Sequence, residues 1–234
     1  MLTKETRVTL QGVSSATLTT VLFKRGLRNV FIQGVFLLNK HAPRMVGEAF
    51  TLRYIPARED LDQIGAFESR GHPQREAIEA CPPGNVLVMD ARRDATAATG
   101  GDILMTRLMV RGVAGVVTDG GLRDSPTIEQ LPWPAYCAAR SAPLNLVRHH
   151  AVDSQVPIGC GGVAVYPGDV VVGDQEGVVV IPAKIASEVA EEGATQTLFE
   201  DWVEARVKEG RSIFGLYPPN PETKAEFEAW KKKK

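Results

Sequence analysis

The stretch GDILMTRLMVRGVAGVVTDGGLRD at residues 101–124 decides the fold. Its first half, 102–111, gathers apolar side chains on one face and predicts a helix, and the apolar run at 112–119 predicts a buried strand. A second apolar run, VLVMD at 86–90, predicts another buried strand upstream. The order strand, helix, strand is typical of a βαβ unit in a parallel or mixed sheet with helices packed on it.

The segments around this unit extend the predicted sheet. Residues 44–55 alternate between apolar and polar and predict a strand. The segment 156–181 contains short β runs, and we expect hairpins with turns at 167–169 and 174–177. The Pro- and Ala-rich segment 125–150 between these two regions predicts irregular structure.

The two ends of the chain favour helices. The N-terminal segment 1–40 is predicted to be helical, with Ser14 as one of several possible N-caps. The C-terminal segment 183–234 is predicted to be a helical tail with one apolar face. We therefore expect an α/β fold over 1–234, a single domain in which a mixed β core is flanked by helices.

Composition excludes several classes of function. Lysine and arginine number 27 against 28 acidic residues, so the chain is no polycation for nucleic acid or a membrane surface. The three cysteines have no framework spacing, and no apolar stretch reaches the ~18 residues of a membrane span. We expect a cytoplasmic protein without a signal peptide, in which Cys160 is a small buried apolar residue and the pair His149-His150 is structural or lies at the surface.

A glycine-rich turn precedes the predicted helix of the βαβ unit. Gly101 and Asp102 end the sequence Thr-Gly-Gly-Asp at 99–102. A helix that begins here presents free backbone N–H groups and a positive end, and both suit a small carboxylate. The alternative is an ordinary N-cap formed by Asp102.

A charged pair follows the second strand of the unit. Two glycines lead into Arg123-Asp124, and twenty residues separate Asp102 from Arg123. Arginine offers a fork of donors to a carboxylate or an oxyanion, and aspartate offers a hard oxygen ligand for Mg²⁺ or Mn²⁺. The alternative is a solvated surface pair. Because both motifs follow strands of one sheet, we expect them to meet at its carboxyl edge.

Three segments carry a resemblance to a known family: GNVLVMD at 84–90, the stretch 101–124, and GCGGVAVYPGDVVVGDQEGVVVIP at 159–182. They resemble the family that joins the regulators of ribonuclease activity A with the class II 4-hydroxy-4-methyl-2-oxoglutarate/4-carboxy-4-hydroxy-2-oxoadipate aldolases. The aldolase branch is marked by an aspartate, twenty residues and Arg-Asp, and this chain has that mark at Asp102 and Arg123-Asp124.

The resemblance implies a role for each residue of the two motifs. It implies that Asp124 holds a divalent metal, Mg²⁺ or Mn²⁺, largely through water, and that Asp102 orders water on that metal. It implies that Arg123 contacts the 2-oxo oxygen of pyruvate. The backbone amides of Ile103 and Leu104 would hold the carboxylate, beside the turn at Gly101.

The resemblance also implies a fold and an assembly. The fold is a swivelling β/β/α domain, and the assembly is a homotrimer or a dimer of trimers with sites between subunits. An acidic residue from the C-terminal helix of the neighbouring subunit would complete the metal's outer shell. Glu200 is our candidate for this residue, with Glu192 as the second choice.

Three functions are compatible with these features. The first is a metal-dependent lyase that cleaves a 4-hydroxy-2-oxo acid to pyruvate and a carbonyl compound, and that decarboxylates oxaloacetate. The second is a ribonuclease-binding regulatory trimer without catalysis. The third is a lyase or dehydratase for a sugar-derived 2-oxo acid.

Two departures from the aldolase pattern bear on the substrate. Arg92-Arg93-Asp94 follows the first buried strand, where it could serve a second carboxylate of the substrate or be solvated surface. His72 and Arg75 stand in an unusually polar segment, where they could bind substrate or belong to a solvated helix start.

Overall fold

The main sheet is built from nine strands in a computed structural model that describes residues 2–233. Its strand order is β1-β14-β13-β3-β4-β6-β8-β2, and β10 also pairs with β3. The strands of this sheet are β1 (Phe31–Ile32), β2 (Phe36–Leu37), β3 (Met45–Pro56), β4 (Val86–Asp90), β6 (Gly115–Thr118), β8 (Ala135–Cys137), β10 (His149–Ser154), β13 (Val170–Gly173) and β14 (Val178–Ile181).

Two small sheets accompany the main one, a hairpin and a three-stranded sheet of order β5-β7-β9. Their strands are β5 (Ala98–Gly100), β7 (Gly121–Leu122), β9 (Ala139–Arg140), β11 (Ile158–Cys160) and β12 (Val163–Val165). The helices are α1 (Lys4–Gln11), α2 (Ser15–Lys24), α3 (Pro73–Ala80), α4 (Asp102–Val110), α5 (Ser125–Ile128), α6 (Ala186–Lys208) and α7 (Pro221–Lys231), with 3₁₀ turns η1 (Ile64–Glu68), η2 (Asn145–Val147) and η3 (Ala183–Ile185).

The centre of the main sheet is parallel. Strands β3, β4, β6 and β8 run in the same direction, and the pairs that add β13, β14 and β10 are antiparallel. All four strand residues Val86–Met89 are buried, as expected for a parallel strand covered on both faces. The predicted order of strand, helix and strand over 86–119 is confirmed by β4, α4 and β6.

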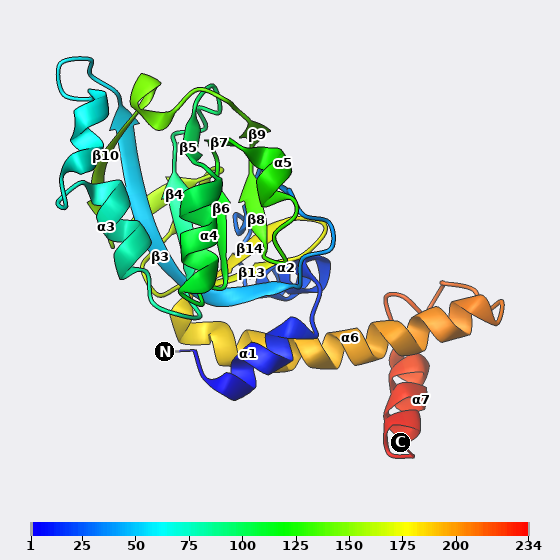
Figure 1. The fold of residues 1–234 in the computed structure, drawn as a ribbon. Helices are drawn as coiled ribbons and strands as arrows, with labels where there is room; N and C mark the ends of the chain where they lie inside the picture. The colour runs from blue at the N-terminus through cyan, green and yellow to red at the C-terminus, as the bar shows by residue number, and fades with distance from the viewer. Residues whose placement is uncertain (1, 234) are drawn as a thin grey trace.

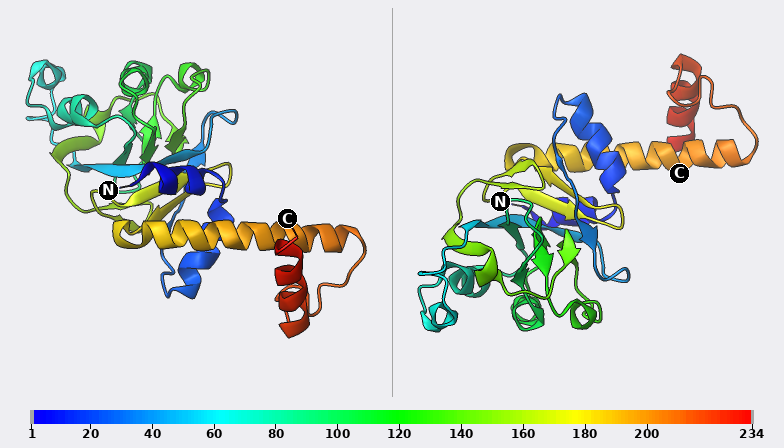
Figure 2. Two further views of the ribbon diagram at one scale, coloured as in Figure 1. Left: turned by 90° about the horizontal axis from the view of Figure 1, so that it is seen from below. Right: turned by 90° about the horizontal axis from the view of Figure 1, so that it is seen from above.

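Helices cover both faces of this curled, mixed sheet. Helices α3, α4 and α5 lie on one side, and α1, α2 and α6 lie on the other (Figure 2). One apolar cluster joins α4 to the sheet through Met105, Leu108 and Leu87. Another joins α2 and α6 to β13 and β14 through Leu18, Val189 and Val172. The structure is therefore the predicted α/β domain with a mixed β core.

Two predictions of local structure between residues 125 and 169 are wrong in part. The segment 125–150 is not irregular throughout, because β8 pairs with β6 inside the main sheet. This strand has only three residues and follows two prolines, so its periodicity is too short to detect. Residues 167–169 do not form a hairpin turn, because the hairpins are β11–β12 and β13–β14. The turn at 174–177 is confirmed.

The helical prediction for 1–40 holds only to Lys24. Ser14 caps α2 through its side chain, as predicted. After Gly26, which has a φ of 85°, the chain turns back and adds β1 beside β14. Val30 and Ile32 are buried there, so tertiary packing supports extended structure over the end of this segment.

A C-terminal arm projects from the sheet. The second half of α6 extends past the body of the molecule, and α7 turns back against its end (Figure 1). Trp202, Leu216 and Phe227 form a small apolar cluster where the two helices meet. No helix within residues 2–233 has the length and apolarity that a membrane crossing requires.

Candidate active site

The small parallel sheet β5-β7-β9 explains the spacing between Asp102 and Arg123. Gly100 at the end of β5 pairs with Leu122 at the end of β7, and the Arg123 amide donates to the Gly100 carbonyl at 3.0 Å. One strand then enters α4 at Asp102, and the other enters the turn at Arg123. The twenty residues between them form α4 and β6, which bring the chain back to the same edge.

Gly101 is required where these two strands end. A Cβ atom on Gly101 would lie 2.7 Å from Asp124 Oδ2 and 3.0 Å from Arg123 Cγ. Asp124 itself has a φ of 54°, in the left-handed region that aspartate tolerates better than most residues. The close approach of the two motifs therefore depends on a residue without a side chain at position 101.

The Arg123 and Asp124 side chains pair with each other and face solvent. Arg123 Nε lies 3.2 Å from Asp124 Oδ2, and the two side chains are 42% and 41% exposed. An ion pair at this exposure contributes little to stability. Both charges therefore remain available to a ligand.

The first turn of α4 lacks a side-chain cap from its N-cap residue, Gly101. Asp102 Oδ1 instead accepts from the Ile103 amide at 2.7 Å, and the Leu104 amide donates to the Gly101 carbonyl at 3.1 Å. The two amides expected to hold a carboxylate are thus engaged within the chain. A bound anion at this positive helix end would have to replace the Asp102 carboxylate at Ile103.

A cavity of about 380 Å³ lies at this point. Its lining contains the predicted residues Gly101, Asp102, Ile103, Leu104, Arg123, Asp124 and Arg75, together with Phe67, Gln74, Ala98, Gly100, Leu144 and Asn145. The structure therefore brings both sequence motifs and Arg75 to one cavity.

Of the two residues predicted from the polar segment, only Arg75 lines the cavity. Its guanidinium lies over the Phe67 ring, 4.5 Å from the ring centroid. The His72 ring also packs against Phe67, with 5.2 Å between the two ring centroids. Burial lowers the pKa of His72, and the nearby Arg75 charge lowers it further. His72 thus supports the wall of the cavity and does not face it.

Two lining residues with polar side chains were missed by the sequence analysis. Gln74 is 2% exposed and Asn145 is 5% exposed, and both carry neutral amides at the cavity. Gln74 stands between the two residues singled out at 72 and 75, so its segment carried a signal. Asn145 lies in η2, in the segment predicted to be irregular, and nothing in the sequence marked it.

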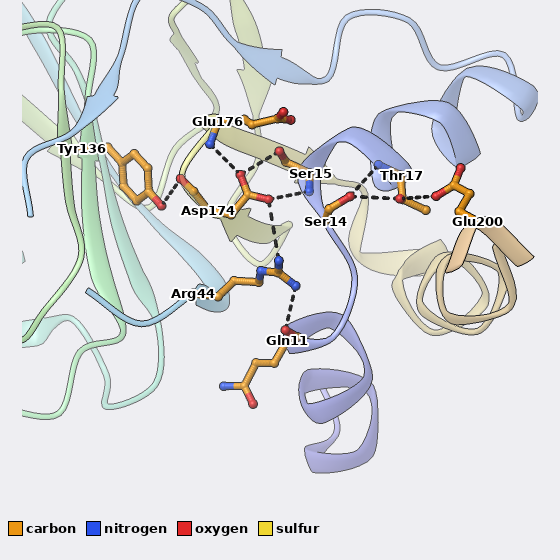
Figure 3. A network of polar contacts seen from close by, with 9 residues as sticks. All are labelled: Gln11, Ser14, Ser15, Thr17, Arg44, Tyr136, Asp174, Glu176 and Glu200. Carbon is orange, nitrogen blue, oxygen red and sulfur yellow. Dashed lines mark hydrogen bonds and ion pairs between the residues drawn. The ribbon is translucent and has the colours of Figure 1, made fainter. Parts of the chain in front are cut away.

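Glu200 and Glu192, the acidic candidates on α6, do not line this cavity. Glu200 accepts hydrogen bonds from Thr17 Oγ1 and Gln196 Nε2, both at 2.9 Å. Figure 3 shows Glu200 facing Thr17 at the start of α2, in a polar network that also contains Asp174. Glu192 pairs with Arg25 at 2.7 Å. Neither residue joins Asp124 within one chain, so any such role requires a second subunit.

The segment Arg92-Arg93-Asp94 does not line the cavity. Arg92 Nη2 donates to the Arg148 carbonyl at 2.8 Å, and Asp94 pairs with Arg148 at 3.1 Å. These charges are engaged by the neighbouring strand β10 and the turn before it. The structure therefore favours the alternative in which this segment does not serve the substrate.

A divalent cation would find two carboxylates at the cavity, on Asp102 and Asp124. Over the described part of the chain, residues 2–233, no three His, Cys, Asp or Glu side chains gather as a ligand set. Mg²⁺ is commonly held by one or two carboxylates while it keeps several waters. The two carboxylates fit such a mostly hydrated ion and do not fit a closed structural site.

Comparisons with known proteins agree on the family. The model of the RraA-like family, Aldolase/RraA, matches residues 15–180. A "Putative 4-hydroxy-4-methyl-2-oxoglutarate aldolase" of Halalkalibacterium halodurans is 39% identical over 108 residues, which are 46% of this chain and 50% of that protein. The chain spans 50%, 26% and 55% of the length of the first three curated relatives that it matches.

Two solved structures share the fold. Streptomyces coelicolor RraAS2, described as an unusual member of the RNase ES inhibitor RraA protein family, matches with a TM-score of 0.75 and 30% identity, covering 86% of this chain and 96% of that one. An uncharacterized protein from Pseudomonas syringae matches with a TM-score of 0.79 and 23% identity, covering 92% and 98%. The family model covers well over half of the chain, and the chain therefore belongs to the RraA-like family.

Proposed function

We propose that this protein is a divalent-metal-dependent lyase that releases pyruvate from a 4-hydroxy-2-oxo acid, and that it also decarboxylates oxaloacetate. The observation that carries the proposal is the meeting of Asp102, Arg123 and Asp124 at one cavity beside the N-terminus of α4. The aldolase name of the relative from Halalkalibacterium halodurans supports the same class of reaction.

The geometry suggests how the pyruvate half is held. The substrate carboxylate takes the positive end of α4, where it replaces Asp102 Oδ1 as acceptor for the Ile103 amide. Arg123 then faces the 2-oxo oxygen with its fork of donors. Asp102, released from the amide, is free to act on the 4-hydroxyl group.

Cleavage breaks the bond between carbons 3 and 4 of the substrate. The 4-hydroxyl proton leaves to Asp102, directly or through one water, the carbonyl product forms, and the bonding electron pair moves into the pyruvate enolate. Arg123 stabilises the negative charge that develops on the 2-oxo oxygen. A divalent cation held by Asp124, with water ordered by Asp102, would supply further positive charge to the developing enolate. Oxaloacetate decarboxylation gives the same enolate with loss of CO₂, and in both reactions a proton added at carbon 3 of the enolate completes pyruvate.

Among the described residues 2–233, no lysine lines the cavity. Formation of a Schiff base with the 2-oxo group needs an amine in contact with it. This observation favours enolate stabilisation by cations over covalent catalysis.

The proposal includes an assembly in which a neighbouring subunit covers the site. Arg123 and Asp124 are each about two-fifths exposed in the single chain, and the C-terminal arm projects away from its own sheet (Figure 1). An arm from a neighbour could bring Glu200 near the cavity of another copy. The homotrimer or dimer of trimers and the swivelling β/β/α topology belong to this proposal. A monomer by light scattering, active without association, would remove this part of it.

Incubation of the protein with oxaloacetate and with 4-hydroxy-4-methyl-2-oxoglutarate in Mg²⁺ or Mn²⁺ tests the activity. Pyruvate release that stops with EDTA and returns with excess Mg²⁺ is expected. Asp124→Ala should abolish the release, whereas Asp153→Ala removes a carboxylate of the exposed pair with Arg53 outside the cavity and should leave it intact. Absence of metal-dependent release from both substrates would refute the lyase.

A second candidate is a regulator that binds a ribonuclease without catalysis. The match to RraAS2 over 86% of this chain favours it, because that protein is described within an RNase inhibitor family. A pull-down with the ribonuclease of the same cell discriminates the two. Tight ribonuclease binding that survives Asp124→Ala, in a protein without lyase activity, would establish the regulator in place of the enzyme.

A further inference from the structure

The cavity contains two buried amide groups with unused hydrogen-bonding capacity. Within residues 2–233, Gln74 Oε1 and Asn145 Nδ2 have no hydrogen-bond partner, and both atoms are hidden from solvent. Both residues line the cavity that holds Asp102 and Arg123. Buried polar atoms are nearly always paired in folded proteins, so each of these atoms calls for a partner from outside the chain.

The orientation of the Gln74 amide is fixed by its other half. Gln74 Nε2 donates to the Thr99 carbonyl at 2.6 Å, and only the nitrogen can make that bond. Thr99 precedes Gly100 and Gly101, so this bond ties Gln74 to the turn that begins α4. The atom left without a partner is therefore an acceptor, and it needs a donor such as a hydroxyl group.

The Asn145 amide and the Arg75 guanidinium provide the complementary groups. Asn145 Nδ2 is a donor and suits a hydroxyl or carboxylate oxygen. Arg75 lies over Phe67 at the same cavity, and none of the ion pairs within residues 2–233 includes it. Its long side chain can move to admit a ligand to the amides beneath and can then face a carboxylate.

We propose that Gln74 and Asn145 form a subsite for the half of the substrate that does not become pyruvate, and that this half carries a carboxylate and a further hydroxyl group besides the 4-hydroxyl that is lost in cleavage. The inference rests on the proposed lyase function for the position of the pyruvate half. It assigns the substrate to the hydroxylated 2-oxo acids of the sugar-acid class. A purely aliphatic second half would leave the acceptor of Gln74 and the donor of Asn145 buried without partners, and such sites reject ligands that lack the hydroxyl group.

Binding of two matched dicarboxylates tests the subsite without turnover. Tartrate and succinate have the same chain length and charge, and they differ by the two hydroxyl groups of tartrate. Calorimetric titration of the intact protein should give tartrate an affinity at least about tenfold higher than succinate, for at least one tartrate stereoisomer. Asn145→Leu should reduce this ratio to within about twofold, because it removes the donor while it preserves side-chain volume.

Two further variants guard against loss of folding. Gln74→Met removes the unused acceptor and also the hydrogen bond to the Thr99 carbonyl. If Gln74→Met does not fold, Asn145→Leu still tests the subsite independently. Asn39→Leu is the matched control, because Asn39 is buried outside the cavity with its amide bonded to Leu131 and His41. Asn39→Leu should keep the tartrate preference of the wild type.

The outcomes separate this inference from the proposed function. Equal affinity for tartrate and succinate, binding of neither, or a preference that survives both Asn145→Leu and Gln74→Met would overturn the subsite. Equal affinity would also be the result if bound water alone satisfies the two amides. A tartrate preference that depends on Asn145, in a protein that releases no pyruvate, would retain the hydroxy-acid subsite and refute the lyase.

Discussion

Two polar regions follow parallel strands at the same end of the molecule, and they use their charges in opposite ways. The first is the region after β4, which we call the β4 turn (residues 90–94), with Asp119 beneath it. The second is the meeting point of Asp102 with Arg123-Asp124. Both contain non-glycine residues of positive φ, so backbone geometry alone does not distinguish them.

The carboxylates of the β4 turn and of Asp119 beneath it accept hydrogen bonds from the chain itself. Asp119 is 1% exposed and accepts from the amides of Ala91, Arg93 and Gly161 at 2.6–3.1 Å. Its burial raises its pKa, and the three amides oppose that rise. Asp90 similarly accepts from the Arg92 amide at 2.9 Å. A carboxylate with this many internal donors holds the backbone in place and has little capacity for a ligand.

At the second region, the charges remain open. Within residues 2–233, the Asp124 carboxylate pairs only with its neighbour Arg123, at about two-fifths exposure, and the Asp102 carboxylate accepts from the adjacent amide. Hydrogen bonding and exposure, more than the presence of charge, therefore separate a structural polar cluster from a binding site in this protein.

The largest difference between the two regions should appear in stability. Asp119→Ala leaves three buried amides without an acceptor, and we expect it to lower the free energy of unfolding by about 3–5 kcal/mol. Asp124→Asn removes the charge of an exposed ion pair and keeps a residue that tolerates the left-handed φ, so it should cost less than about 1 kcal/mol. Urea unfolding measures both. Comparable losses in the two variants would contradict the distinction.

For activity we expect the larger loss from a substitution at the Asp102 and Arg123-Asp124 region and the smaller loss from one in the β4 turn. Arg123→Ala removes the cation proposed to face the enolate oxygen and should lower kcat for oxaloacetate about 10²- to 10³-fold. Arg92→Ala in the β4 turn is the control and should change kcat by less than about threefold. Initial rates at saturating Mg²⁺ check this prediction, and an equal loss in Arg92→Ala would show that the β4 turn also serves the substrate.

A smaller effect is expected from the glycine between the two motifs. Gly101→Ala places a methyl group against Asp124 Oδ2 and Arg123 Cγ, and these side chains must shift to admit it. We expect kcat/KM to fall about tenfold, since misplacement of reacting groups by a fraction of an ångström is costly. Gly159→Ala has open space around its Cβ position and should keep wild-type kcat/KM.

The smallest effect concerns pH and the β4 turn. His149 is buried beside Arg92, and burial, followed by that neighbouring charge, lowers its pKa. A lowered histidine pKa means that the unfolded chain binds the proton more readily, so stability falls as pH drops through the ordinary value of about 6.5. Unfolding free energies at pH of about 7.5 and about 5.5 should differ less in His149→Gln than in the wild type. An unchanged pH dependence would exclude His149 as a source.

Much of this fold was predictable from the sequence, because several elements carry one apolar periodicity over their whole length. The strands at 45–56 and 86–90, the helix α4 and the long helix α6 have runs that match one period over a full element. Strand β8 and the β1 segment have two or three residues each, and their strand structure depends on neighbours far along the chain. Such contacts leave no local pattern.

The candidate site shows the same limit. Asp102, Arg123 and Asp124 were predictable because strand ends concentrate functional side chains and because the motif spacing is specific. Asn145 was not predictable, and only the segment of Gln74 carried a signal, because burial with an unused amide atom is a property of the folded cavity. His72 and Arg75 looked equivalent in sequence, and only the packing around Phe67 separates them.

The most direct test of the central claim is a titration of Mn²⁺ into the protein followed by electron paramagnetic resonance. We expect Mn²⁺ to bind with retention of several waters, to bind more tightly in the presence of pyruvate, and to lose both properties in Asp124→Ala. Mn²⁺ binding that is absent, or that pyruvate and Asp124→Ala both leave unchanged, would contradict the assignment of Asp102, Arg123 and Asp124 as a joint site for a divalent cation and a 2-oxo acid.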